Sequence, residues 1–348
     1  MLLELPRFST PILHQLRDAS AGLNARIGLA GPAGLPALGG IRVLPYTSDE
    51  AADEDARRLS EGMARKAAVL DLPYAGGKTV VRGDPGNIKT DAFWAALGAG
   101  INTLEGRYVG GEDVNMSVSD VEALRQHTPY AVGTSQGCGN PAPFTARGVF
   151  NAMKAAIEYR FGAQGFTGIK VLIQGAGSVG HELARLVHAA GGELAVCEIQ
   201  PWRAARLAQL FGAEIVSPKS LFDRRIDVFA PCALGSVIQG NNLARLDIGV
   251  ICGAANNQLE SPAFADLLHR MGIVYVPDYL ANGGGLIAGA EEYEADREGR
   301  VFDPIRVDAK LESIAELSAS YLKRSAAEAR PPAAVCEDVI AERLNRPA

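Results

Sequence analysis

The sequence predicts an α/β protein of two domains, one of them built on a doubly wound parallel sheet. Its 348 residues exceed what one ordinary hydrophobic core organises. In the second half of the chain, short apolar runs alternate with helical patterns, which is the order of a parallel sheet covered by helices. A glycine-rich turn joins the first of these runs directly to the helix that follows it.

The composition argues against several classes of protein. Hydrophobic residues make up 47% of the chain and charged residues 21%, a balance typical of globular proteins. The net charge of −6 offers no basic surface to nucleic acid, and no apolar stretch is long enough to suggest a membrane partner. The first residues lack the basic flank and apolar stretch of a secretory signal, so we expect a cytoplasmic protein.

The cysteines give no indication of a metal site. There are five of them, far apart and without a CxxC pair, so we expect buried free thiols and no metal ion.

The second half of the chain supplies the strands of the doubly wound sheet. A helical pattern at 145–161 precedes an apolar run at 170–174, a glycine-rich turn and a helix that ends near residue 190. Further strand-like runs are found at 193–197, 226–230, 248–252 and 273–276. Helical segments between these runs predict parallel strands.

The first part of the chain is typical of a separate α+β domain. It has helical patterns at 49–66, 90–104 and 120–127 and a strand-like run at 78–82. Near the other end, residues 281–289 are glycine-rich and are followed by EEYEADREGR, which we expect to form a turn, and then by helices at 308–324 and 335–343. We therefore expect residues 1–138 with 323–348 to form one domain and 139–322 the other.

A dinucleotide-binding motif, GAGSVG, follows the first strand of the parallel sheet. Gly175, Gly177 and Gly180 match GxGxxG, in which the glycines permit a tight turn, close approach of a pyrophosphate and close packing of the helix. Ser178 and Val179 would begin that helix, whose N-terminus favours phosphate charge. These features predict a Rossmann domain.

The next strand ends at Glu198, where a carboxylate can accept hydrogen bonds from a ribose diol. Because this carboxylate would repel a 2′-phosphate, the sequence favours NAD as the cofactor. Arg203 and Arg206 keep NADP as an alternative.

Two lysines of the first domain are candidates for catalysis. Lys66 lies in a helical pattern, and Lys78 begins a strand after two glycines that bring the backbone close to a ligand. A lysine on a buried strand is partly desolvated, which lowers its pKa towards that of a usable base. A later Gly-Gly precedes Glu112 and Asp113; we assign a turn or capping role to Glu112 and keep Asp113 as a partner for a lysine.

Several motifs together resemble one enzyme superfamily. They are GLPALGGIRVLPY, the Lys66 and Lys78 pair, GGEDV, GNPAPFTARGV, IQGAGSVG, APCALGSVI, GAANNQL and VYVPDYLANGGG. In this combination and order, over about residues 25 to 320, they resemble the leucine and phenylalanine dehydrogenases of the glutamate/leucine/phenylalanine/valine dehydrogenase superfamily. Two departures are Ala75, where the family usually has glycine, and a short segment before Gly34.

The resemblance implies a reaction and roles for individual residues. It implies a homo-oligomer that oxidatively deaminates an L-amino acid to the 2-oxo acid and ammonia, in a cleft between a substrate-binding domain and the NAD-binding domain. Lys78 would be the general base and Asp113 its partner, while Lys66 and Asn257 would bind the substrate carboxylate and Gly40 would shape the site. Thr145, Ala233 and Asn256 would border the nicotinamide.

The expected side-chain pocket carries no charge, so we expect an apolar substrate rather than glutamate. Its candidates are Leu38, Met63, Gly111, Leu286 and Gly289. In the resembling family, aromatic-specific members tend to have Gly and Leu where this chain has Gly111 and Leu286. We therefore expect phenylalanine or tryptophan to be accepted along with large aliphatic amino acids, and keep a branched-chain-specific leucine or valine enzyme as the alternative.

Two other functions remain in competition. One is a non-catalytic NAD-binding regulatory protein, although both lysines and Asp113 are present. The other is a hydroxy-acid dehydrogenase, whose base is normally a histidine. The histidines of this chain are expected in helical patterns without an acidic orienter; they are His14, His127, His181, His188 and His269.

Overall fold

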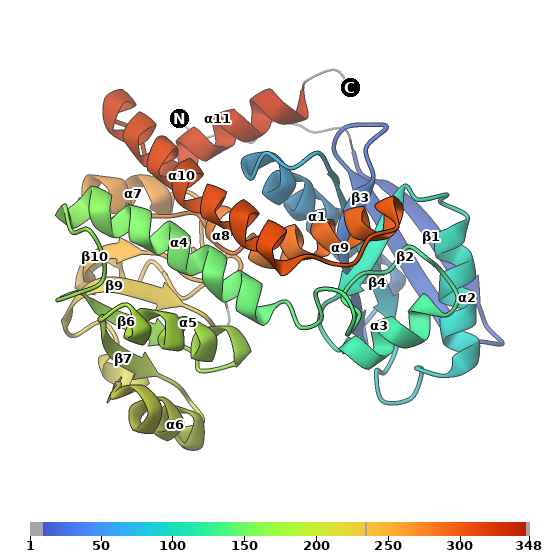
Figure 1. Ribbon diagram of the computed structural model, residues 1–348, viewed down its shortest axis with the longest axis horizontal. Coiled ribbons are helices and arrows are strands. Elements are labelled where there is room, and N and C mark those ends of the chain that lie inside the picture. The colour runs from blue at the N-terminus through green and yellow to red at the C-terminus, as the bar shows by residue number, and fades with distance from the viewer. Residues whose placement is uncertain (1–9, 234, 346–348) are drawn as a thin grey trace. The chain divides into compact units, whose positions relative to one another are not determined.

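The computed structural model describes residues 10–233 and 235–345, and the chain divides into two compact units. Of the described residues, unit 1 comprises 142–285 and 308–338, and unit 2 comprises 10–141, 286–307 and 339–345 (Figure 1). The residues before Thr10, for which the sequence predicts ordinary folded chain, lie outside the described part. Within the described ranges, no helix has both the length and the apolar character needed to cross a membrane.

Unit 2 contains a five-stranded mixed sheet with strand order β1-β2-β4-β3-β5. The strands are β1 (Ile12–Asp18), β2 (Leu23–Ala30), β3 (Ala37–Leu44), β4 (Ala75–Arg82) and β5 (Tyr108–Glu112). β2 is antiparallel to β1 and β4, whereas β3 is parallel to β4 and β5. The sequence predicted only part of β4, and it placed His14 in a helical pattern although His14 lies in β1.

Helices cover both faces of this sheet. α1 (Asp49–Val69) packs on one face, where a Cβ on Gly28 of β2 would lie 2.6 Å from the Ala56 carbonyl oxygen. On the other face, Ile27 joins a core with α2 (Asp91–Asn102) and α3 (Val118–Arg125). The consecutive residues Ile27 and Gly28 of β2 therefore lie on opposite faces of the sheet. The three predicted helices of this region are confirmed.

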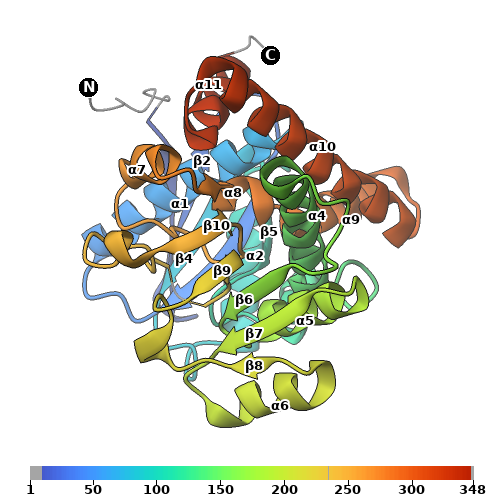
Figure 2. The same cartoon turned by 90° about the vertical axis from the view of Figure 1, so that its left-hand side faces the viewer.

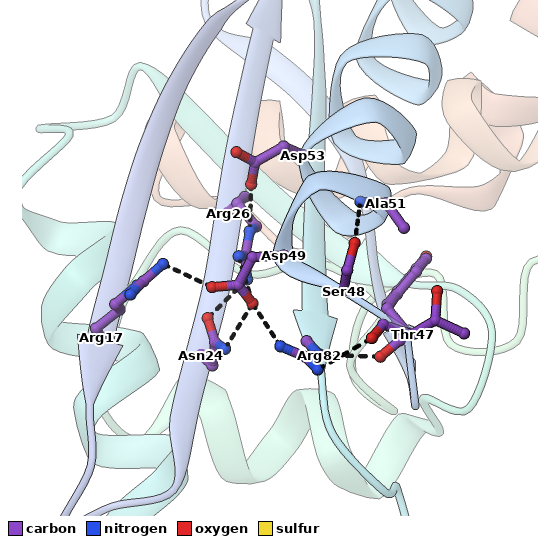
Figure 3. A network of polar contacts seen from close by, with 10 residues as sticks. Arg17, Asn24, Arg26, Thr47, Ser48, Asp49, Ala51, Asp53 and Arg82 are labelled. Atoms are coloured by element: carbon purple, nitrogen blue, oxygen red, sulfur yellow. Dashed lines mark hydrogen bonds and ion pairs between the residues drawn. The ribbon is translucent and has the colours of Figure 1, made fainter.

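A polar network fixes the N-terminus of α1 to the sheet (Figure 3). The side chain of Arg26 is fully buried, and it pairs with Asp49 and Asp53 in the first turns of the helix. Asp49 also binds Arg17 of β1 and Arg82 of β4, each through a 2.7–2.8 Å contact. The network joins three strands to one helix, so it sets the position of α1 against the sheet.

Unit 2 also contains a helix that the sequence did not predict. α9 (Gly284–Glu298) includes the EEYEADREGR segment up to Glu298, so the expectation of a turn there was wrong. The helical pattern was hidden because two acidic residues face inward: Glu291 is 0% exposed and pairs with Arg300, and Glu292 is 3% exposed and binds backbone amides. Residues of α9 from Leu286 onward belong to unit 2.

Unit 1 is built on a six-stranded parallel sheet with order β11-β10-β9-β6-β7-β8, of which β10, β9, β6, β7 and β8 follow one another in Figure 2. The strands are β6 (Lys170–Gln174), β7 (Glu193–Cys197), β8 (Glu214–Ile215), β9 (Arg225–Pro231), β10 (Asp247–Ile251) and β11 (Val274–Tyr275). The chain leaves β6 towards β7 on one side and later returns to β9 on the other. The predicted doubly wound fold is therefore confirmed, with its switch point at β6.

The helices of unit 1 follow the predicted alternation. They are α4 (Ala142–Phe161), α5 (Ser178–Ala189), α6 (Pro201–Phe211), α7 (Phe264–Arg270) and α8 (Asp278–Ala281), with short 3-10 turns at Pro218–Ser220 and Leu243–Arg245. Two long helices follow α9: α10 (Pro304–Glu328) and α11 (Pro332–Leu344).

The division into units differs from the predicted domain limits in two places: residues 286–307, expected in the cofactor domain, belong to unit 2, and the C-terminal residues are shared between the two units. Residues 323–338 belong to unit 1, where Glu337 accepts a hydrogen bond from Tyr279. Residues 339–345 belong to unit 2, where Arg343 donates to the carbonyl of Ala68 at the end of α1. Contacts of this kind join residues far apart in sequence, so local patterns do not place them.

Candidate functional site

The glycine-rich loop after β6 packs as a phosphate-binding turn does. Gly175 has φ of +100°, and a Cβ on it would lie 2.7 Å from the Cβ of Ala233. A Cβ on Gly180 would lie 2.0 Å from the Gly175 carbonyl oxygen, so only glycine lets the helix begin this close to the strand.

The N-terminus of α5 is open to a ligand. Gly177 is its N-cap residue, and a Cβ built on Gly177 would meet no atom of the described residues within 4 Å. Ser178, the first residue of the helix, is exposed, and Val179 is half-buried. The amides of this first turn and the helix dipole can therefore receive a phosphate group.

Glu198 lies next to this loop. Its carboxylate accepts hydrogen bonds of 2.7 Å from the Ala176 amide and 2.9 Å from the Gln200 amide. Burial raises the pKa of Glu198, but these amides and the nearby charge of Arg203 outweigh it and hold the pKa below its usual range. An ionised carboxylate beside the glycine loop fits the ribose of a dinucleotide.

The loops after β9 and β10, which carry the predicted cofactor residues Ala233 and Asn256, lie close together within unit 1. A Cβ on Gly235, just beyond Ala233, would lie 2.3 Å from the Asn256 carbonyl oxygen. The Asn256 side chain accepts a 2.8 Å hydrogen bond from Asn282, and the Asn257 amide donates to Asp278 at 2.6 Å. Thr145 is half-buried in α4.

Asn257 differs from the other predicted substrate-binding residues in its position. It lies in unit 1 with a φ of +53°, whereas Lys66, Gly40 and the five side-chain candidates lie in unit 2. The structure thus groups Asn257 with the predicted cofactor residues of its own unit.

The glycines before Lys78 serve packing. A Cβ on Gly76 would lie 2.1 Å from the Ala64 amide of α1, and a Cβ on Gly77 would lie 2.6 Å from the ring of Tyr108. The expectation that they bring backbone to a ligand is therefore corrected: they let α1 and Tyr108 approach β4 and bury Lys78, whose side chain is 6% exposed.

Lys78, in the middle of β4, forms an ion pair with Asp113, the residue after β5, across the intervening strand β3. Lys78 Nζ lies 2.8 Å from Asp113 Oδ2, and the same oxygen accepts a 2.8 Å hydrogen bond from Arg42 Nε. Gly40 makes room for the pair, because a Cβ there would lie 2.6 Å from Asp113 Cβ and 3.2 Å from Lys78 Nζ.

The electrostatics of the pair favour a basic amine beside an ionised carboxylate. Burial lowers the pKa of Lys78, and Asp113 only partly opposes this effect. Burial raises the pKa of Asp113, but the charges of Lys78 and Arg42 outweigh it and keep the pKa below its usual range. A lysine with a lowered pKa releases its proton more readily and can therefore act as a base.

An apolar cluster in unit 2 contains two of the predicted side-chain candidates. Leu38 is 2% exposed, and Leu286 is partly buried against the same cluster. The cluster also includes Ala67, Tyr74, Val109, Val132, Ala290 and Tyr293.

The two candidate glycines face one residue of this cluster, Val132. A Cβ on Gly111 and a Cβ on Gly289 would each lie 3.4 Å from Val132 Cγ2. The structure thus brings these two glycines from distant parts of the sequence to one apolar surface.

Met63 and Lys66 are half-buried on α1. Met63 lies one turn before Ala67, a member of the apolar cluster, and therefore on the same side of the helix. Lys66 lies in the last turn of α1.

Sequence reasoning missed three residues of this region: Arg42, Val132 and Glu292. Arg42 is two residues after Gly40 on β3, so the period of a strand places it on the same face as Gly40. Val132 follows Ala131 in the chain, and Ala131 forms an isolated β-bridge with Gly110 of β5. Neither Val132 nor Glu292 carried a signal in its local sequence.

The role expected for Glu112 was wrong. Glu112 is the last residue of β5, and Ser117 is the residue that caps the following helix. Burial and the neighbouring carboxylates of Asp120 and Asp113 raise the pKa of Glu112.

Comparison with known proteins gives the family. A model described as Glutamate/Leucine/Phenylalanine/Valine dehydrogenase matches residues 195–341, and one described as Glu/Leu/Phe/Val dehydrogenase, dimerisation domain, matches residues 31–134. The leucine dehydrogenase of Geobacillus stearothermophilus is 43% identical over 286 residues, which cover 81% of this chain and 78% of that protein. The chain belongs to the Glu/Leu/Phe/Val dehydrogenase family.

Two further similarities involve the L-tryptophan dehydrogenase of Nostoc punctiforme. Its sequence is 42% identical over 271 residues, covering 78% of this chain and 76% of that protein. Its crystal structure aligns with a TM-score of 0.83 at 34% identity, covering 96% and 95% of the two chains. The chain is therefore an amino-acid dehydrogenase, an oxidoreductase that uses a nicotinamide cofactor, and the resemblance stated from its motifs is confirmed.

Proposed function

We propose that this protein catalyses the reversible, NAD-dependent oxidative deamination of an apolar L-amino acid to the 2-oxo acid and ammonia. The observation that carries the proposal is the buried ion pair, in which Lys78 Nζ lies 2.8 Å from Asp113 Oδ2. A base of this kind is what the attack of water on an imine requires.

In the proposed reaction, residues of the chain bind the substrate and move the protons. Lys66 binds the substrate carboxylate. Bound NAD supplies the two-electron oxidation of the Cα–N bond. Lys78, as the neutral amine, takes a proton from the water that adds to the resulting imine, and Asp113 stabilises the ammonium that forms. Lys78 then returns this proton to the nitrogen of the water adduct, whose Cα–N bond breaks to give the 2-oxo acid and ammonia.

The choice of NAD over NADP rests on Glu198. Its carboxylate lies against the glycine loop through the Ala176 amide and would repel a 2′-phosphate. The three glycines, with Ser178 and Val179, would hold the pyrophosphate, while Thr145, Ala233 and Asn256 would border the nicotinamide. Arg203, close enough to affect the pKa of Glu198, keeps NADP as the alternative.

For the substrate we propose an aromatic side chain, with large aliphatic ones also accepted. The absence of a Cβ at Gly111 and Gly289 leaves volume beside Val132, and Leu38, Met63 and Leu286 add apolar surface. The two similar proteins named above are a leucine and a tryptophan dehydrogenase, and this similarity supports both aliphatic and aromatic side chains. A branched-chain-specific enzyme is the alternative.

The test is a panel of L-amino acids assayed for reduction of NAD and of NADP by the absorbance of the reduced nicotinamide. We expect turnover of phenylalanine, tryptophan and leucine with NAD. Turnover of valine and leucine without phenylalanine or tryptophan would favour the branched-chain alternative. No turnover of any amino acid, with retained NAD binding, would contradict the proposal and favour a regulatory protein.

We also propose a cytoplasmic homo-oligomer. The support for self-association is the family model for residues 31–134, which is described as a dimerisation domain. Light scattering coupled to size-exclusion chromatography measures the mass, and a mass of one chain, 36.6 kDa, would contradict the proposal.

A further inference from the structure

Asp113 is bound by two cations through one of its two oxygens. Lys78 Nζ and Arg42 Nε each lie 2.8 Å from Asp113 Oδ2. Within the part of the chain that the structure describes, Oδ1 accepts no hydrogen bond. Arg42 therefore competes with Lys78 for one oxygen and leaves the other able to bind a water molecule or an amine.

Arg42 is itself held in place from its far side. Its Nη1 lies 3.3 Å from Asp55 Oδ2 on α1, and that oxygen accepts a 2.6 Å hydrogen bond from the hydroxyl of Tyr46. The other oxygen of Asp55 pairs with Arg58 at 2.7 Å. Arg42 and Asp55 are 18% and 15% exposed, so the guanidinium is fixed between two carboxylates in a largely buried position.

The geometry points to Arg42 as a positioning residue for the reaction: it orients Asp113 and, by its charge, favours the neutral form of the Lys78 amine. The inference rests on the proposed function of Lys78 as the general base. Arg42 acts through Asp113 and through its charge, and no contact with substrate is required of it.

The charges around Lys78 set the direction of the effect. Arg42 on β3 disfavours the ammonium form of Lys78, whereas Asp113 after β5 and Asp55 on α1 favour it. Tyr108 of β5 contributes no opposing charge, because burial raises the pKa of its hydroxyl. Removing Arg42 leaves the two carboxylates unopposed, so the amine should hold its proton more tightly.

The expected magnitude follows from the distances. Because both nitrogens lie 2.8 Å from one oxygen, they are less than about 6 Å apart. At an effective dielectric constant of about 20, a cation at this separation shifts a pKa by about two units, and partial exposure to solvent reduces the shift to about one.

The experiment measures the pH dependence of kcat/KM for the full-length enzyme with saturating cofactor. In Arg42→Gln the acid limb should move to higher pH by about one unit, with recovery towards the wild-type plateau at high pH. In Asp55→Asn the limb should move the opposite way, and in Arg42→Lys it should stay in place. Arg82→Gln, which breaks an arginine–aspartate pair of the same sheet away from Asp113, is the control and should leave the limb unmoved.

A second readout does not depend on catalysis. The rate at which a small amine-selective reagent modifies Lys78, followed by peptide mass spectrometry across pH, reports the ionisation of the amine directly. It should show the same upward shift in Arg42→Gln. If the wild type turns over no amino acid, the proposed function fails while this titration still tests Arg42.

The outcomes separate positioning from a purely structural role. A lowered plateau with an unmoved acid limb and an unmoved Lys78 titration would overturn the inference, as would equal shifts in Arg42→Gln and Arg82→Gln. Shifts of opposite sign in Arg42→Gln and Asp55→Asn would support it, because loss of packing alone does not reverse sign with charge.

Discussion

Replacing Glu292 by glutamine should destabilise unit 2 by about 3 kcal/mol. Glu292 Oε2 accepts hydrogen bonds of 2.8 Å from the amides of Gly133 and Cys138. Its Oε1 accepts from the Thr134 amide at 3.1 Å and from the Thr134 hydroxyl at 2.7 Å. The glutamine amide keeps one oxygen but turns its NH2 group towards donors, so two hydrogen bonds to a buried acceptor are lost at about 1.5 kcal/mol each.

The assay can report on unit 2 alone. The chain has two tryptophans, of which Trp94 is buried in α2 and Trp202 is exposed in α6. In a Trp202→Phe background, the fluorescence of Trp94 follows the unfolding of unit 2 in urea at a fixed protein concentration. Glu298→Gln, at an exposed position of the same helix, is the matched control and should unfold at the wild-type urea concentration.

A small effect of Glu292→Gln on stability would contradict this prediction. If Glu292→Gln lowers the free energy of unfolding of unit 2 by less than about 1 kcal/mol, the four hydrogen bonds do not stabilise the loop as the geometry requires. An equal loss of unfolding free energy in Glu298→Gln would show that the loss of any negative charge on α9 destabilises the unit. It would contradict a specific role for the hydrogen bonds of Glu292.

Four further predictions concern the site. Lys78→Ala should lower kcat by at least about 10³-fold with NAD affinity near normal, measured by quenching of protein fluorescence; substantial residual turnover would exclude Lys78 as the base. Gly111→Ala should lower kcat/KM for phenylalanine relative to leucine by about tenfold, in competition assays. Glu198→Gln should raise the ratio of NADP to NAD efficiency by about tenfold, measured with each cofactor in turn. Because the folded chain depresses the pKa of Asp113, its contribution to stability is complete above about pH 4 and is lost as the pH falls; Asp113→Asn should flatten this acid loss, measured by urea unfolding at each pH.

The parts of the fold that a local pattern encodes were predictable. The alternation of apolar runs and helices gave the parallel sheet, because each buried strand must be apolar along its length. The glycine loop was readable because the turn between β6 and α5 admits no side chain at Gly175 and Gly180. In unit 2 the strands went largely unseen, since β3 and β5 carry Gly-Gly pairs that lower their apparent strand propensity.

What escaped prediction depends on contacts between distant parts of the sequence. From its local sequence, Glu292 would be taken for a surface acid. The amides that donate to it belong to the loop at 133–138, which is distant in the sequence. The local sequence gives Arg42 no special role. Its two partners, Asp113 and Asp55, are 71 and 13 residues away in the sequence and lie on either side of it only in the folded chain. Lys78 and Asp113 were candidates because a Gly-Gly precedes each acidic or basic segment, but only the resemblance assigned their roles as base and partner.

The glycines around Lys78 connect the fold to the chemistry. An amine acts as a base near neutrality only if it is desolvated, and desolvation requires that other groups approach its strand closely. Gly76 admits α1, Gly77 admits the ring of Tyr108, and Gly40 admits Asp113, each at distances that a Cβ would forbid. The same close packing that buries the Lys78 amine also places the Asp113 carboxylate beside it. A single methyl group at Gly40 would therefore do more than occupy space: it would push Asp113 away from Lys78, and the amine would remain buried without its partner.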